Sequence, residues 1–116
     1  EEFIDAIRVV VQQGAVEGTI SVLDAPPGRR PTPSLAEAGA WFRGLPAAER
    51  AKAEQILAIA VHQAAFGMLC VLDGVRAVED GPSTGRFVLA YRRDGQDTEL
   101  NATGGPMLHD LFNAAD

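Results

Sequence analysis

The chain has 116 residues with 16 acidic and 10 basic side chains, which gives a formal net charge of −6. Apolar residues make up 47% of it, which argues against intrinsic disorder, and the length suits one core rather than two. The acidic balance argues against a nucleic-acid partner, because phosphate recognition needs clustered Lys and Arg. A single cysteine, Cys70, excludes an intramolecular disulfide and a multi-cysteine metal cluster, and its apolar neighbours predict a buried, inert thiol.

Residues 2–23 are predicted to form a helix, although Thr19–Val22 would also suit a strand. Apolar or small residues recur at steps of three and four, which is the pattern of one helix face: Ile4, Ile7, Val11, Ala15, Gly18 and Val22. Gly14 is the expected place for a bend. Small residues on this stripe permit close approach of a second helix, so a homodimer is the structural alternative if the stripe is exposed.

Residues 25–33 carry four prolines and are predicted to be an extended connector. Arg29 and Arg30 lie in it, so a docking loop for an acidic partner is the alternative to a plain linker, which we favour. Ser34 and Glu37 have capping-box spacing and are expected to begin a short helix that Gly44 ends.

Residues 46–72 are predicted to form one long helix of about 40 Å. Its second half is apolar nearly all round, so we expect neighbouring elements to enclose it at the centre of the domain. The uncharged stretch 56–72 is shorter than the roughly 20 residues that a membrane span needs, and His62 and Gln63 lie near its middle. We therefore predict a buried core helix and no membrane partner.

After Asp73 and Gly74 the pattern changes to short β-compatible segments at 75–78, 86–92 and 97–101. Asp94-Gly95 is a strong hairpin signal, residues 79–83 are a predicted turn, and residues 107–113 suit a closing helix. The predicted fold is therefore a single α+β domain over residues 1–116. Its helices pack around the long central helix, with a small antiparallel meander of two or three strands and a C-terminal helix.

The candidate binding cluster consists of polar side chains near the end of the long helix and on the last helix: Asp73, Arg76, His109, Asp110 and Asn113. Arg76 is expected to form a salt bridge with Asp73 or Asp110, rather than to bind an anion beside Glu79 and Asp80. Residues 73–116 carry 8 acidic and 4 basic groups, which predicts an acidic surface suited to a basic protein.

The competing interpretation is a small metal-assisted hydrolase that uses His62, His109 and Asp110. His62 lies in the most apolar part of the chain, where a histidine is more often a core residue with satisfied ring nitrogens. Adjacent helical residues such as His109 and Asp110 point about 100° apart, so a metal would need further ligands. No metal and no cofactor is predicted.

Three strings carry a resemblance: VEGT followed by PPGR at residues 16–29, LDGVRA at 72–77 and LHDLFN at 108–113. With the Trp41-Phe42 helix, they resemble a family of small stand-alone bacterial proteins without an assigned activity, similar in character to immunity proteins that neutralise toxins. With no signal-peptide pattern at its start, the chain is predicted to be a cytoplasmic, non-enzymatic protein-binding module, as an immunity or regulatory protein would be.

Overall fold

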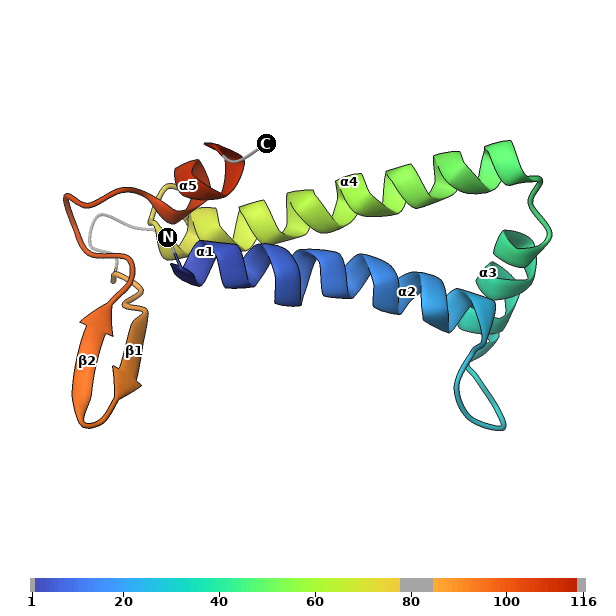
Figure 1. Cartoon of the computed structure of the whole chain (residues 1–116), viewed down its shortest axis with the longest axis horizontal. Coiled ribbons are helices and arrows are strands. Elements are labelled where there is room, and N and C mark those ends of the chain that lie inside the picture. Colours follow the sequence, from blue (N-terminus) through green and yellow to red (C-terminus); the bar gives the residue numbers. More distant parts are fainter. Residues whose placement is uncertain (1, 78–84, 115–116) are drawn as a thin grey trace. The chain divides into compact units, whose positions relative to one another are not determined.

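The computed structural model describes residues 2–77 and 85–114. The helices are α1 (Glu2–Ala6), η1 (Ile7–Gln13), α2 (Gly14–Asp24), α3 (Pro33–Arg43), α4 (Ala47–Leu72) and α5 (Leu108–Ala114), and the strands are β1 (Ala90–Arg93) and β2 (Gln96–Glu99) (Figure 1). The predicted α+β class, with its long helix, antiparallel strands and C-terminal helix, is confirmed.

The chain divides into two compact units, which we describe one at a time. The first, called the terminal unit, consists of Glu1–Arg8 and Gln63–Asp116; the second, called the middle unit, is Val9–His62. The single domain over residues 1–116 stays a prediction.

The opening helix is confirmed, and the alternative of a strand over Thr19–Val22 is wrong, because α1, η1 and α2 follow one another as helix up to Asp24. The irregular part is η1, a π-helical segment over Ile7–Gln13. Its wider hydrogen-bonding pattern ends at the residue before Gly14, so the irregularity precedes the glycine where a bend was expected.

In the middle unit, α3 approaches α2 closely at Gly39. A Cβ at that position would lie 2.8 Å from the carbonyl oxygen of Leu23, so no larger residue fits without movement of the backbone. Arg43, on the same helix, donates from Nη1 to the same carbonyl at 2.6 Å. A glycine and an arginine one turn apart thus hold α3 against the last turn of α2.

The start of α3 differs from the predicted capping box. Thr32, not Ser34, is the N-cap, and its Oγ1 accepts from the amide of Leu35 at 3.3 Å. Pro33 explains the shift, because proline at the first helical position has the required φ and needs no amide partner. The predicted end of the helix at Gly44 is confirmed.

Arg50 joins the beginning of α4 to α2 and α3 within the middle unit. It donates to Asp24 at 2.6 Å and to Glu54 at 3.0 Å. Its guanidinium also lies 4.5 Å from the ring centroid of Phe42, a buried side chain. These contacts place one aromatic ring and two carboxylates around one cation.

The helix α4 has the predicted length, but the expectation that neighbours enclose its apolar half is wrong. Its buried residues are Gly67, Leu69 and Cys70, whereas Ile56 and Ile59 are 66% and 56% exposed. Buried side chains of α1 and α5 pack only against its last turns, at Leu69. By length and composition alone α4 could cross a membrane, and 17% of its most apolar stretch is buried.

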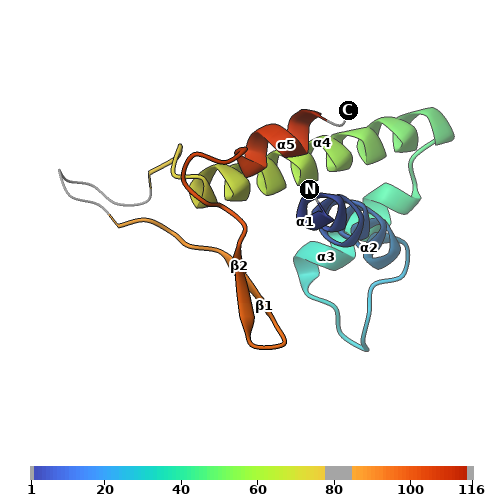
Figure 2. The same cartoon turned by 60° about the vertical axis from the view of Figure 1, so that its left-hand side comes forward.

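The core of the terminal unit consists of four buried side chains: Ile4, Leu69, Leu108 and Phe112. They come from α1, α4 and α5, and both views show α5 lying along the last turns of α4 (Figures 1 and 2). The core therefore joins the first and last helices of the chain to the end of the long one.

The strands β1 and β2 form an antiparallel hairpin with Tyr91 opposite Thr98. Asp94 and Gly95 have φ angles of 52° and 78°, the left-handed values that a two-residue turn of this kind requires. Every strand residue is exposed. Residues 75–77 form no strand; Val78 and the predicted turn at 79–83 lie outside the described residues. The meander is thus two-stranded in the described part of the chain.

Candidate functional site

Asp73 follows α4 directly and caps α5 across 35 positions of sequence. Its side chain is 3% exposed. Oδ1 accepts from the amide of Leu108 at 3.0 Å, and Oδ2 accepts from the amide of His109 at 2.8 Å. The first amides of a helix have no intrahelical partner, and a negative charge there is favoured by the helix dipole. Asp73 therefore supplies what the start of α5 lacks.

The imidazole of His109 lies between two carboxylates. Its Nδ1 is 2.6 Å from Oδ2 of Asp73, and its Nε2 is 3.4 Å from Oδ1 of the exposed Asp110. The ring of Phe66 meets it edge-on, with centroids 5.6 Å apart. A buried carboxylate on Nδ1 fixes the orientation of an imidazole, so Asp73 sets the position of the His109 ring.

Arg8 holds the other end of α5 and was not singled out from the sequence. Its Nη2 donates to the carbonyl oxygens of Leu111 and Phe112 at 2.5 and 2.9 Å. The last carbonyls of a helix are unpaired within it and favour a nearby cation. The short helix α5 therefore has a carboxylate at its start and a guanidinium at its end.

Three members of the predicted cluster, Asp73, His109 and Asp110, are in direct contact in the structure. The guanidinium of Arg76 lies over α4, where a Cβ on Gly67 would come within 2.7 Å of its Nη1. The predicted bridge from Arg76 to Asp73 or Asp110 is not among the ion pairs of the described residues; both oxygens of Asp73 instead accept from α5.

Asn113 is exposed on the last turn of α5. Glu79 and Asp80, considered with Arg76 as an anion site, lie outside the described residues.

Asn101 is a buried residue that the sequence analysis did not select. Its Nδ2 donates to the carbonyl oxygens of Leu72 at 2.7 Å and Phe87 at 2.9 Å, and its Oδ1 accepts from the amide of Leu89 at 2.8 Å. It thereby attaches the segment before β1 to the end of α4. The only signal in the sequence was an asparagine at the last position of the predicted strand 97–101.

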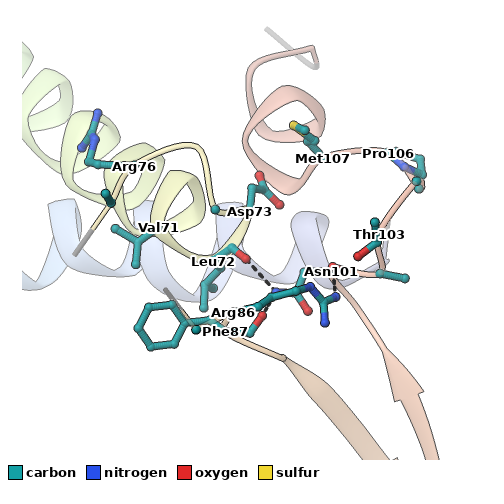
Figure 3. Close-up of a pocket in the computed structure, with 16 residues that line it drawn as sticks. Val71, Leu72, Asp73, Arg76, Arg86, Phe87, Asn101, Thr103, Pro106 and Met107 are labelled. Carbon is teal, nitrogen blue, oxygen red and sulfur yellow. Dashed lines mark hydrogen bonds between the residues drawn. The ribbon is translucent and has the colours of Figure 1, made fainter. Parts of the chain in front are cut away.

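A cavity of about 370 Å³ opens beside these residues (Figure 3). The end of α4, the segment before β1 and the loop before α5 line it. The lining side chains that bear on its chemistry are Asp73, Arg76, Arg86, Phe87, Asn101 and Met107. Two members of the predicted cluster, Asp73 and Arg76, therefore border it.

The charges of the hairpin are paired within it. Arg92 donates to Asp97 through two nitrogens, at 2.6 and 3.1 Å, and this guanidinium lowers the pKa of the Asp97 carboxyl. Arg86 donates to Glu99 at 2.8 Å. We predicted from the net charge that acidic side chains such as Asp97 and Glu99 form an open acidic surface, but these two are paired with arginines. Asp110, in contrast, is 74% exposed.

His62 belongs to the middle unit, where its Nδ1 is 3.3 Å from Nε2 of Gln12 and its ring is half-buried. Within residues 2–77 and 85–114, no group of three or more His, Cys, Asp or Glu side chains is placed to hold a metal ion. Cys70 is buried, as predicted.

No protein-family model matches this chain, and no similar curated protein or solved structure was found. The resemblance to small bacterial immunity-like proteins stays a prediction.

Proposed function

We propose that this chain is a protein-binding module that acts through one surface of its terminal unit. This hairpin-side surface is defined by large exposed apolar side chains of the terminal unit that follow α4, precede or lie in β1, or precede α5: Val75, Phe87, Val88, Tyr91 and Met107. Each is between 43% and 60% exposed, and this exposure is the observation that carries the proposal. We infer that they form one patch, because contiguous apolar side chains left in water are typical of surfaces that meet another protein.

The hairpin suits such a contact. Both of its faces are exposed, and an isolated two-stranded hairpin is only marginally stable in water. Its charged residues neutralise one another, as Arg92 does Asp97, and the centre of a protein interface is depleted in uncompensated charge. Tyr91 would supply an aromatic contact of the kind that dominates binding energy.

Two polar residues beside the cavity, Asp73 from the predicted cluster and Asn101, have structural duties. The oxygens of Asp73 bind the start of α5, and Asn101 attaches the hairpin segment to α4. This supports binding in place of catalysis at that position. The cytoplasmic immunity or regulatory role and the basic partner are parts of the same proposal, and their support is the net charge and the sequence resemblance. The metal-assisted hydrolase stays the alternative prediction.

The test is affinity capture with the tagged full chain from a lysate of the organism that encodes it, followed by quantitative mass spectrometry. Tyr91→Ser removes an aromatic ring that is 56% exposed on the hairpin; Trp41→Ser is the matched control, since Trp41 is 64% exposed in the middle unit. A central aromatic contributes about 2 kcal/mol to an interface, or roughly 30-fold in affinity.

We expect a partner that the wild type and Trp41→Ser recover equally and that Tyr91→Ser recovers at least ten-fold less. Circular dichroism confirms that each variant is folded. Equal recovery by both variants, or recovery of nothing beyond what an unrelated acidic protein of similar size captures, would overturn the proposal.

A further inference from the structure

Two polar side chains that line the cavity, Asp73 and Asn101, have their acceptor oxygens already engaged. Both carboxylate oxygens of Asp73 accept hydrogen bonds from α5. The amide oxygen of Asn101 accepts from Leu89, and its backbone carbonyl accepts from Arg86. A ligand that mainly donates hydrogen bonds would therefore meet oxygens that already accept hydrogen bonds within the protein.

Donor groups, in contrast, are in excess at the same place. Arg86 uses one nitrogen, Nη2, for its bonds to Glu99 and to the carbonyl of Asn101. Its Nε and Nη1 make no hydrogen bond to a residue in the described ranges, and its side chain is 45% exposed. Figure 3 shows Arg86 beside Asn101 at the cavity. Both edges of a guanidinium that can bind a carboxylate through two hydrogen bonds include Nη2, so Nε and Nη1 of Arg86 can each donate a separate hydrogen bond to a single carboxylate oxygen.

Apolar walls complete the cavity. Phe87 and Met107 both line it and are 50% and 43% exposed, and Leu72 and Pro106 add further apolar surface. A volume of about 370 Å³ lies at the small end of the range for ligand pockets, which runs from roughly 300 to 1,000 Å³. It suits a group of a few carbon atoms.

From this inventory we infer that the cavity binds a carboxylate carried on a short apolar group, with Arg86 as the residue that pairs with the carboxylate. Two sources offer this chemistry: a small free acid, and the C-terminal apolar residue of another polypeptide. The cavity shares Phe87 and Met107 with the hairpin-side surface, but the comparison of acid with amide below tests the inference without a protein partner.

The test is an NMR titration of the ¹⁵N-labelled full chain with N-acetyl-leucine and, separately, with its neutral analogue N-acetyl-leucinamide. We expect saturable shifts of the Gly104 and Gly105 amides and of the Arg86 Nε–H with the acid, and binding at least ten-fold weaker with the amide. The peptide Gly-Ser-Gly-Ser-Leu, with a free or an amidated C-terminus, distinguishes the sources. Tighter binding of the free peptide than of N-acetyl-leucine indicates a polypeptide, and the reverse order a small acid.

Arg86→Gln should abolish the shifts, and Arg92→Gln is the matched control, since Arg92 is likewise ion-paired but does not line the cavity. The comparison of acid with amide on the wild type needs no variant, so it decides the matter even if Arg86→Gln unfolds. Equal binding of acid and amide, shifts confined to residues outside the cavity, or no saturable shift with any of these probes would overturn the inference.

Discussion

Replacing Asp73 by alanine should release α5 from the terminal unit. The carboxylate accepts from two backbone amides and one imidazole, all partly buried. A buried amide left without a partner costs about 1–3 kcal/mol, and the loss of a helix cap costs roughly 0.5–2 kcal/mol. We therefore expect Asp73→Ala to lower the free energy of unfolding by about 2–4 kcal/mol. Asp73→Asn keeps an acceptor oxygen and should lose less.

In Asp73→Ala, α5 should unfold locally before the whole protein unfolds. A helix of 7 residues does not persist alone in water, and Leu108 and Phe112, which α5 contributes to the core, are nearly fully buried. Hydrogen exchange of the α5 amides should accelerate in Asp73→Ala more than exchange in α3. Urea unfolding gives the stability change, with Glu37→Ala, an exposed acidic position, as the control. A loss within 0.5 kcal/mol of that control would refute the reasoning.

Three further changes test other contacts. Arg8→Ala should lower the unfolding free energy by roughly 1–2 kcal/mol in a urea titration, because it frees two carbonyls of α5; no change would contradict this role. Gly39→Ala should cost about 1–3 kcal/mol in the same assay, since the added methyl meets the Leu23 carbonyl, and an unaltered unfolding midpoint would show that the backbone adjusts freely. The hydrogen bond from Arg50 lowers the pKa of Asp24, so its stabilisation is present above the unfolded pKa and lost as the pH falls through the lower folded one. The stability difference between wild type and Asp24→Asn should therefore be larger at pH 7 than below about pH 4, and a difference that does not change with pH would contradict it.

Local signals in the sequence predicted the elements well. Three patterns predicted helices or their ends: the spacing of apolar residues before Asp24, the glycine at position 44 and the uncharged segment up to Leu72. Each pattern involves residues that lie within a turn or two of one another. The Asp94-Gly95 pair likewise determines the hairpin turn through its own backbone angles. Such features depend on neighbours along the chain, so a pattern of residue types is enough to find them.

Contacts between residues far apart in the sequence could not be predicted from local patterns. Asp73 and His109 were both selected, but as members of a polar cluster, and nothing local shows that the carboxylate caps a helix 35 positions away. The bond from Arg8 to Leu111 spans 103 positions and leaves no trace in composition. The enclosure of α4 was overestimated for a related reason, since periodicity shows which residues are apolar but not whether other elements cover them.

The most direct test of the proposed function is site-specific photo-crosslinking in cells of the organism that encodes the chain, with benzoylphenylalanine in place of Tyr91 or, separately, Trp41. Both side chains are aromatic and more than half exposed. We predict one defined crosslinked protein from position 91 and none from position 41. Crosslinks to the same protein from both positions, or none from position 91, would contradict a binding surface on the hairpin.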